Sequence, residues 1–332
     1  MLGSKVENLF HVLDETTEIL MQTCHLTYLE ALVETAENLF QGEILQQVDD
    51  VAKKKIEKLY QSIKLDMLSS EEIRRAFQLV TLKGMRDYVQ PHHQMTPDSI
   101  GILISGLLRE FLINGKLKTF TLLDPAIGTG NLVATIQNQL SDYAIEAYGV
   151  EVDDVLLKLA YVQANLQAQS IQLYNQDALE PLFIDPVDIV VSDLPVGYYP
   201  RKEFASQYEL NREEGHAFSH YLFIEQSLKH TKPGGLLFFV IPNHLFEGED
   251  APKLHAFLKE HAFIQGLIQL PLSMFKNERN AKNLFILKKK IEGETPPKKV
   301  FMAQMPKLTN KNSVQDILTQ IRAWFRQENR NK

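Results

Sequence analysis

The spacing of hydrophobic positions changes once along the chain, near residue 118. Before that point apolar residues recur every three or four positions, as a helix requires, and one such stripe ends at Gly42, a natural helix stop; its members are Leu29, Leu32, Val33, Ala36, Leu39 and Phe40. Ser69 and Glu72 form a capping-box pattern ahead of another apolar stripe. The pattern predicts roughly four helices over residues 1–90, a helical domain for packing or partner binding without chemistry of its own.

From about residue 118, short apolar runs bounded by Gly, Pro and Asp alternate with helix-length segments. This alternation predicts an α/β fold with a doubly wound, mostly parallel, seven-stranded Rossmann-like sheet. The predicted strands cover residues 119–123, 147–150, 171–174, 188–191, 236–241, 264–269 and 283–287. Residues 231–235 are expected to form a turn, and a last apolar run near Phe301 precedes a final helix carrying Val314, Ile317, Leu318, Ile321, Trp324 and Phe325.

Composition places the chain among ordinary globular proteins. Its 332 residues favour about two domains, and we expect a helical domain over residues 1–90, a cofactor-binding domain over 91–292 and a strand-helix extension over 293–332. Cys24 is the single cysteine, which excludes an intramolecular disulfide and a cysteine-zinc cluster. No run approaches the roughly 18 apolar residues of a membrane span, and the N-terminus lacks a secretory pattern. We therefore expect a cytoplasmic protein without membrane contact.

Charge is unevenly distributed. The formal net charge of −7 is the wrong sign for a protein that wraps nucleic acid over a large area. Residues 298–332, however, hold eight Lys or Arg against two acidic residues, so the extension is a local basic patch.

The sharpest motif is a predicted strand that runs into a Gly-rich turn and then a helix, over residues 122–132. Its glycine spacing fits neither the dinucleotide fingerprint nor a P-loop. Asp124, at the start of the turn, suits a cationic ligand, so the charge favours S-adenosylmethionine with its amino and sulfonium groups. The candidate cofactor contacts in this motif are Asp124, Pro125, Ala126, Gly128, Gly130, Asn131 and Leu132.

Two further acidic residues follow predicted strands. Glu151, with Val152 after it, ends the second strand, where ribose hydroxyls are normally bound. Asp177, followed by Ala178, comes after the third strand and is placed to accept a hydrogen bond from the adenine amine. Each alone is more often a helix cap or turn former. Their order and spacing with Asp124 favour one cofactor crevice.

Residues 85–290 resemble the adenine-specific methylase family of class I S-adenosylmethionine-dependent methyltransferases, particularly the methylation subunits of type I restriction systems and their small stand-alone bacterial relatives. The matching segments are the Thr96-Pro97 helix start, the Asp193-Leu194-Pro195-Val196 run, and residues 266–271 and 283–288. The resemblance implies that Thr96 contacts the methionine end of the cofactor. Thr96 also suits an N-cap, and free N–H groups in the first turn can hold a carboxylate. His92 and His93 precede it; neighbouring residues on an extended segment point to opposite sides, and we assign no metal.

The run after the fourth strand aligns with the family's catalytic signature, Asn/Asp/Ser-Pro-Pro-aromatic. An exocyclic adenine amine is a poor nucleophile, so hydrogen-bond acceptors must draw it towards tetrahedral geometry. The resemblance assigns this catalytic role to Asp193, which also borders the cofactor, and to the carbonyl of Leu194, with Pro195 keeping that residue extended.

Two departures from the signature concern the substrate. Leu194 replaces the first proline, and Val196 stands where an aromatic ring should stack on the target base. Tyr198 or Tyr199 could supply that ring; alternatively both pack beneath residues 200–214, a charged segment expected to form a mobile lid. Both interpretations stay open, and Val196, Tyr198 and Tyr199 are the candidate substrate-binding residues.

Three functions follow. The leading hypothesis is direct methyl transfer to the exocyclic amine of adenine in DNA, which is preferred to RNA as the nucleic-acid partner, with DNA contacts supplied by a separate recognition subunit or by the basic extension. The second changes the acceptor to RNA or to a glutamine side chain of a protein. The third is a cofactor-binding scaffold without turnover, which a channel blocked by Leu194 and Val196 would favour. In each, the helical domain is a candidate for dimerisation.

Overall fold

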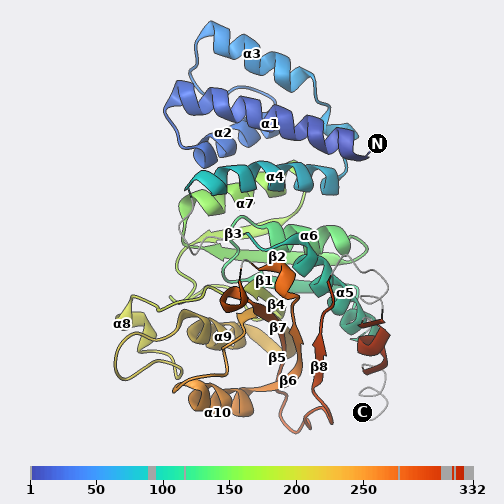
Figure 1. Ribbon diagram of the computed structural model, residues 1–332, viewed down its shortest axis with the longest axis vertical. Coiled ribbons are helices and arrows are strands. Elements are labelled where there is room, and N and C mark those ends of the chain that lie inside the picture. The colour runs from blue at the N-terminus through green and yellow to red at the C-terminus, as the bar shows by residue number, and fades with distance from the viewer. Residues whose placement is uncertain are drawn as a thin grey trace.

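The computed structural model describes residues 2–88, 95–115, 117–275, 277–307, 316–317 and 319–324. Figure 1 shows a layer of helices at one end of an elongated molecule and a sheet covered by helices at the other. None of the described helices is long and apolar enough to cross a membrane.

The N-terminal region forms the four helices that the spacing predicts: α1 (Leu2–Cys24), α2 (Tyr28–Gln41), α3 (Asp50–Gln61) and α4 (Ser70–Tyr88). Gly42 ends α2 in the left-handed conformation at φ 76°, and its N–H donates to the Asn38 carbonyl. The capping box before α4 is also present, because the Ser69 N–H donates to the Glu72 carboxylate at 2.8 Å and the Glu72 N–H to the Ser69 hydroxyl at 3.2 Å. Local sequence therefore fixes these helix ends.

The sheet contains all seven predicted strands and one more. The strands are β1 (Thr119–Asp124), β2 (Ala144–Glu151), β3 (Ile171–Asn175), β4 (Val187–Asp193), β5 (Thr231–Pro242), β6 (Ala262–Gln269), β7 (Lys282–Lys289) and β8 (Phe301–Gln304). They lie in the order β3-β2-β1-β4-β5-β7-β6-β8, with β7 antiparallel to both neighbours and β8 parallel to β6. The expected seven-stranded sheet is thus corrected to eight strands, since the extension supplies the edge strand β8.

One predicted turn lies inside a strand. β5 begins at Thr231, which pairs with Val187, and the next residue in register is Leu236 opposite Ile189. The residues between form a bulge in which Gly234 takes φ 79°. A Cβ on Gly235 would come within 2.7 Å of the Asp188 carbonyl oxygen, so this bulge requires glycine.

Helices cover both faces of the sheet. The helices α5 (Asp98–Gly115) and α6 (Asn131–Gln139) pack with one apolar cluster, while α9 (Ser219–Lys229) and α10 (Ala251–His261) pack with the other. Of the predicted final helix, residues 316–317 and 319–324 are described, and Ile321 is buried against the α5 side. Val314, Leu318 and Phe325 lie outside the described residues.

The helical region shares its core with α7 (Asp154–Leu166), the helix between β2 and β3. One apolar cluster joins α1, α2 and α4 to four buried residues of α7: Leu156, Leu159, Val162 and Leu166. Figure 1 shows α4 lying directly along α7. The region is therefore packed onto the sheet unit through an apolar interface.

The segment expected to be a mobile lid is anchored instead. It contains the short helix α8 (Lys202–Ala205), and three of its side chains are buried: Ala205, Tyr208 and Leu210. The Tyr208 hydroxyl donates to the Leu179 carbonyl, and the buried Glu225 carboxylate accepts the N–H groups of residues 209 and 210. The sequence did not predict these buried contacts, because residues 200–214 are mostly polar or charged.

Candidate active site

The carboxyl ends of the parallel strands bring the predicted acidic residues to one edge of the sheet. β1 ends at Asp124, β2 at Glu151 and β4 at Asp193, while Asp177 follows β3. The strand order reverses between β1 and β4, which pair directly. Such a switch point forms the ligand crevice in open α/β sheets.

Asp124 is only 1% exposed, and the Ala126 N–H donates to its carboxyl group. Burial, together with the negative charges of Asp193 and Glu151, raises the pKa of Asp124 to about 7. The three carboxyl groups therefore repel one another, and a bound cation would relieve that repulsion.

Glu151 is held by backbone N–H groups. One oxygen accepts the Gly128 N–H at 2.9 Å, and the other accepts those of Val152 and Asp153 at 3.0 and 2.9 Å. Burial raises the pKa of this carboxyl group as well. Beside it, the Val152 side chain is 69% exposed, an apolar surface at the mouth of the crevice.

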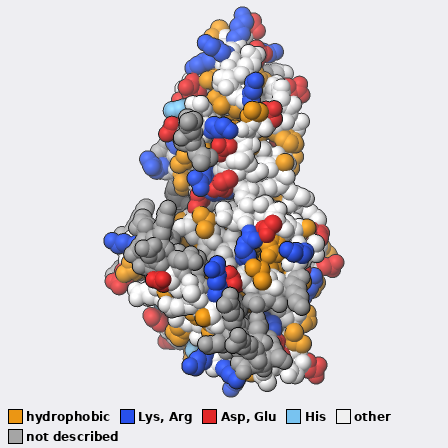
Figure 2. All heavy atoms as spheres, turned by 90° about the vertical axis from the view of Figure 1, so that its right-hand side faces the viewer, with side chains coloured by type: hydrophobic (Ala, Val, Ile, Leu, Met, Phe, Trp, Pro, Cys, Tyr) orange, Lys and Arg blue, Asp and Glu red, His pale blue; other side chains and the backbone are white. Residues whose placement is uncertain are grey.

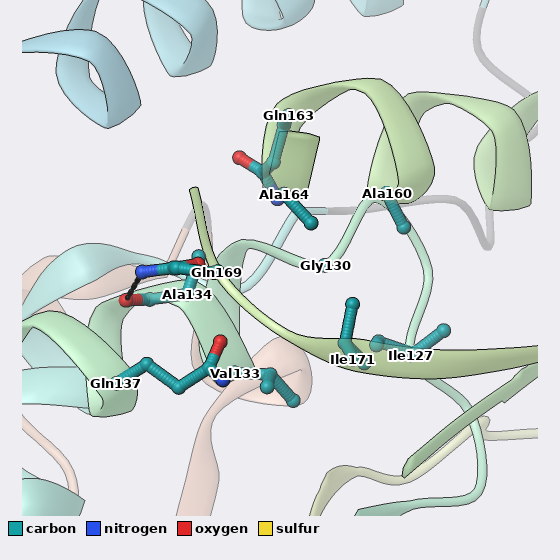
Figure 3. Close-up of a pocket in the computed structure, with 10 residues that line it drawn as sticks. All are labelled: Ile127, Gly130, Val133, Ala134, Gln137, Ala160, Gln163, Ala164, Gln169 and Ile171. Carbon is teal, nitrogen blue, oxygen red and sulfur yellow. Dashed lines mark hydrogen bonds between the residues drawn. The ribbon is translucent and has the colours of Figure 1, made fainter. Parts of the chain in front are cut away.

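The two glycines of the Gly-rich turn have different surroundings. Gly128 has φ 55°, and a Cβ there would meet nothing within 4 Å, so its backbone faces open space. Gly130 has φ 81°, and a Cβ would come within 2.8 Å of Gln163 Nε2 and 3.1 Å of Ala160 Cβ on α7. Figure 3 shows Gly130 passing beneath α7 at a shallow hollow behind the turn. Gly128 thus leaves room for a ligand, whereas Gly130 allows close packing.

The other residues of this motif are mainly structural. Pro125 and Leu132 are buried, and Ala126 is partly buried against the core. The Asn131 side chain is 3% exposed, accepts from Arg74 and donates to the Thr96 carbonyl, both at 2.9 Å. It is therefore occupied by protein partners.

Thr96 meets Asp193 at the crevice, where its hydroxyl donates to Asp193 Oδ2 at 3.2 Å. Helix α5 begins at Asp98, so Pro97 rather than Thr96 precedes its first residue. The predicted cap position is thus displaced by one residue. His92 and His93 lie outside the described residues.

Asp177 and Tyr199 form a hydrogen-bonded pair. The Tyr199 hydroxyl donates to Asp177 Oδ2 at 2.7 Å, and the Leu179 N–H donates to Oδ1 at 2.9 Å. Tyr199 is 6% exposed, and Ala178 is also buried. Burial and the Asp177 carboxylate raise the pKa of Tyr199. Tyr199 therefore supports Asp177, and its ring is not free to stack on a ligand.

Tyr198 is placed differently, being 60% exposed. Its ring stacks on Phe218 with centroids 4.8 Å apart, and Phe218 stacks on His220 at 5.2 Å. A β-bridge between residues 198 and 218 holds the two segments together. The structure thus separates the two tyrosines, with only Tyr198 presenting its ring to the surface.

Asp193 has a partner that the sequence did not reveal. Lys282 Nζ donates to Asp193 Oδ1 at 2.6 Å, as an ion pair. Lys282 opens β7, and because that strand is antiparallel its first residue lies opposite Pro242, at the carboxyl end of β5. Strand direction, which local sequence does not encode, brings this lysine to the site.

The remaining residues of the signature run differ in burial. The Leu194 side chain is 1% exposed, packs in the α9–α10 core, and its N–H donates to the Val240 carbonyl. Pro195 is partly buried, and Val196 is 37% exposed. The side chain of Leu194 therefore lies in the core.

The buried polar atoms near this edge that have no hydrogen-bond partner among the described residues include His220 Nδ1, Asn243 Oδ1 and Asn283 Oδ1. They lie in the first turn of α9, just after β5 and near the start of β7. Burial lowers the pKa of His220 to about 4, so its ring is neutral at physiological pH. Unpartnered buried groups of this kind call for a ligand or water.

Comparison with known proteins shows the family to which the chain belongs. Residues 92–328 match the model of the N-6 DNA methylase family, and residues 7–85 match that of the YtxK N-terminal helical domain. The chain is 46% identical over 330 residues to the uncharacterised protein YtxK of Bacillus subtilis, covering 99% of this chain and 100% of that protein.

Solved structures give the same result. A crystal structure of a candidate class I S-adenosylmethionine-dependent methyltransferase from Listeria monocytogenes superposes with a TM-score of 0.91 at 46% identity, covering 97% of this chain and 99% of that one. A type I restriction-modification methyltransferase subunit from Streptococcus thermophilus shares the fold, with a TM-score of 0.66 at 17% identity over 95% of this chain and 74% of that one. The chain therefore belongs to the N-6 DNA methylase family of S-adenosylmethionine-dependent methyltransferases, and S-adenosylmethionine is its cofactor.

Proposed function

We propose that this protein transfers the methyl group of S-adenosylmethionine to the exocyclic amine of adenine in DNA. The observation that carries the proposal is Asp193, which stands at the carboxyl end of β4 with both carboxylate oxygens held, one by Thr96 and one by Lys282. Its carboxylate and the Leu194 carbonyl after it are the acceptors that would draw the amine towards the methyl group.

The cofactor, when bound, supplies an electrophilic methyl group on a sulfonium. The crevice suits a cationic ligand because the negative charges of Asp193 and Glu151 lie close to the buried Asp124. In this proposal Asp124 and Thr96 hold the methionine end, Glu151 binds the ribose, and Asp177 accepts from the adenine amine. Gly128 and Val152 supply the open backbone and the apolar edge of the site.

The acceptor side is proposed to hold a planar base. Exposed Tyr198, backed by Phe218 and His220, offers a stacking face where the family's usual aromatic is replaced by Val196. A stacking face favours a base over a glutamine amide.

The scaffold hypothesis loses its main support. It required Leu194 and Val196 to block the substrate channel, but the Leu194 side chain is in the core. A catalytic role is therefore preferred.

DNA is preferred to RNA because of the family, and it requires further contacts. On the face shown in Figure 2, basic side chains are interspersed with acidic ones over the part of the chain that is described. The net charge of −7 also opposes a broad DNA interface. We therefore propose that a separate recognition subunit provides DNA affinity; the Streptococcus protein is itself named as one subunit of a restriction-modification system.

The test is to incubate purified protein with methyl-labelled S-adenosylmethionine and, separately, unmethylated DNA, RNA and cell protein extract. Label recovered as N6-methyladenine in DNA supports the proposal, whereas label in RNA or protein overturns the acceptor assignment. Cofactor binding by calorimetry with no label anywhere would point to a missing subunit or to a binding protein.

A substitution at Asp193 tests the catalytic role. Asp193→Ala should abolish transfer while the dissociation constant of the cofactor stays within about threefold.

A substitution at Tyr198 tests the stacking role. Tyr198→Ala should raise the KM for DNA, whereas Tyr161→Ala serves as the matched control, because Tyr161 is an exposed tyrosine on α7. Equal effects of the two tyrosine variants would contradict the stacking role.

A further inference from the structure

Arg74, in α4 of the helical region, is fully buried although it carries a charge. Every N–H of its guanidinium is used. Two donate to Glu71 at 2.8 and 2.9 Å, two to Asp98 at 2.8 and 3.0 Å, and one to Asn131 at 2.9 Å. Five donors with five acceptors is full satisfaction for an arginine, which indicates a fixed geometry.

The acceptors belong to segments that border the cofactor crevice. Asp98 is the first residue of α5, and Asn131 is the first residue of α6, directly after the Gly-rich turn. Asn131 also donates to the Thr96 carbonyl at 2.9 Å and lies 3.3 Å from Asp98 Oδ1, while Gln78 of α4 donates to Asp98 at 2.6 Å. One network therefore joins α4 to the starts of α5 and α6.

The same network ends at the proposed catalytic carboxylate. Thr96, whose carbonyl Asn131 holds, donates its hydroxyl to Asp193. A continuous series of contacts thus runs from Arg74 through Asn131 and Thr96 to Asp193.

Electrostatics keep this network charged. Burial alone would lower the pKa of Arg74, but its hydrogen bonds to Glu71 and Asp98 raise it. Burial would likewise raise the pKa of Asp98, and Arg74 lowers it. Removing the guanidinium would leave the partly buried Asp98 carboxylate without its counter-charge, and the start of α5 would lose its ion pair to α4.

We propose that Arg74 is a positioning residue through which the helical region fixes the cofactor site, by holding the segment Thr96–Asp98 against Asn131. The inference rests on the proposed site, and it gives the helical region a role in methyl transfer. Arg74 acts through Thr96 and Asn131.

The test measures the dissociation constant for S-adenosylmethionine by calorimetry in the full-length protein. Arg74→Met and Arg74→Lys should each weaken binding at least tenfold, because a lysine cannot make both forks. Arg75→Met is the matched control, since Arg75 is adjacent, is exposed and pairs with the same Glu71 carboxylate without reaching Asp98 or Asn131. It should leave the dissociation constant unchanged.

A purely structural role is separated by a second comparison. Val80→Ala in the apolar core of α4 should lower the melting temperature without weakening cofactor binding. Asn131→Ala should weaken binding about as much as Arg74→Lys, and the double variant should be no weaker than either alone. Additive effects, or equal effects of Val80→Ala and Arg74→Lys on affinity, would overturn the proposal.

Glu151→Ala distinguishes an error in the proposed cofactor site from an error in the inference about Arg74. If it leaves cofactor affinity unchanged, the proposed site is wrong and this inference falls with it. If it weakens binding while folded Arg74 and Asn131 variants bind normally, the inference alone is wrong.

Discussion

Acidic residues gather negative charge at the carboxyl edge of the sheet, and without a bound ligand this charge does not stabilise the protein. Asp124 is buried next to the charges of Asp193 and Glu151, and only Asp193 has a lysine partner among the contacts described. Because a cation would relieve the repulsion between these carboxyl groups, the site is suited to a cationic ligand.

Cofactor affinity should therefore depend on pH through Asp124. With its pKa near 7, about a tenth of this carboxyl group is ionised at pH 6, so S-adenosylmethionine should bind roughly tenfold more weakly at pH 6 than at pH 8. Asp124→Asn should remove this part of the pH dependence. Calorimetry at both pH values checks it, and an identical pH dependence in both proteins would contradict it.

The folding stability of the protein should depend on pH in the opposite direction to its cofactor affinity. Because folding raises the pKa of Asp124 above its usual value of 3.8, this residue's contribution to stability is fully present below pH 3.8 and is lost as the pH rises through about 7. Without cofactor, Asp124→Asn should melt at a higher temperature than the wild type at pH 8, with the gap closing towards pH 5. Thermal unfolding measures both.

Lys282 should affect turnover more than cofactor binding. Lys282→Met removes the ion pair to Asp193 Oδ1, so the carboxylate can leave the position from which it accepts the amine. We expect kcat to fall roughly tenfold, the worth of one charge-assisted hydrogen bond, with cofactor affinity nearly unchanged. Lys289→Met is the control, because Lys289 lies at the other end of β7 and donates to the carbonyls of Leu228 and Thr231. A loss confined to cofactor affinity would refute the assignment.

At the scale of elements, the Gly-rich turn joins β1 to α6 while packing against α7. Its two glycines meet separate requirements, since Gly128 faces open space and Gly130 lies against Gln163 and Ala160. Substituting each in turn should therefore separate packing from binding.

Gly130→Ala should lower the free energy of unfolding by roughly 2–4 kcal/mol, from the left-handed backbone and the crowding against α7 together. Gly128→Ala should cost about 1–2 kcal/mol, from the backbone alone, but should reduce cofactor affinity more strongly per unit of stability lost. Denaturant unfolding and calorimetry on both variants provide the check. Equal losses of stability in the two variants would mean that α7 accommodates the added methyl group at position 130 without cost.

At the scale of the whole molecule, the three regions predicted from the sequence share apolar cores with one another. The helical region completes its apolar core with α7, and Arg74 ties it to α5 and α6. At the other end, β8 extends the sheet, and Met305 and Ile321 are buried in the same cluster as α5. Both flanking regions therefore contribute to the fold of the catalytic unit.

A chain ending at Glu292 tests the extension. It would expose the edge of β6 and remove the buried Met305 and Ile321, so it should unfold at lower temperature and aggregate through the open edge. A chain ending at Lys307 keeps β8 and should be intermediate. Because β8 is at the opposite end of the sheet from β2 and β3, the folded fraction should still bind cofactor. Unchanged melting temperatures in both would show that the extension is not part of the core.

The sequence by itself determined what depends on neighbouring residues. Strand positions, the stop at Gly42 and the capping box of Ser69 follow from local periodicity and turn chemistry. The three acidic residues after β1, β2 and β3 were found because parallel strands align their carboxyl ends, so strand order alone gathers them. The Gly-rich turn and the signature run around Asp193 are likewise contiguous in sequence.

Only the tertiary structure decided what depends on distant residues meeting. Lys282 reaches Asp193 because β7 runs antiparallel, and Arg74 reaches Asn131 because α4 packs against α6. It also separated two adjacent tyrosines, since Tyr199 turns inward to Asp177 while Tyr198 stays exposed on Phe218. A local pattern specifies the backbone conformation of an element, whereas the partners of a side chain depend on how elements pack, and that packing is set by the whole core.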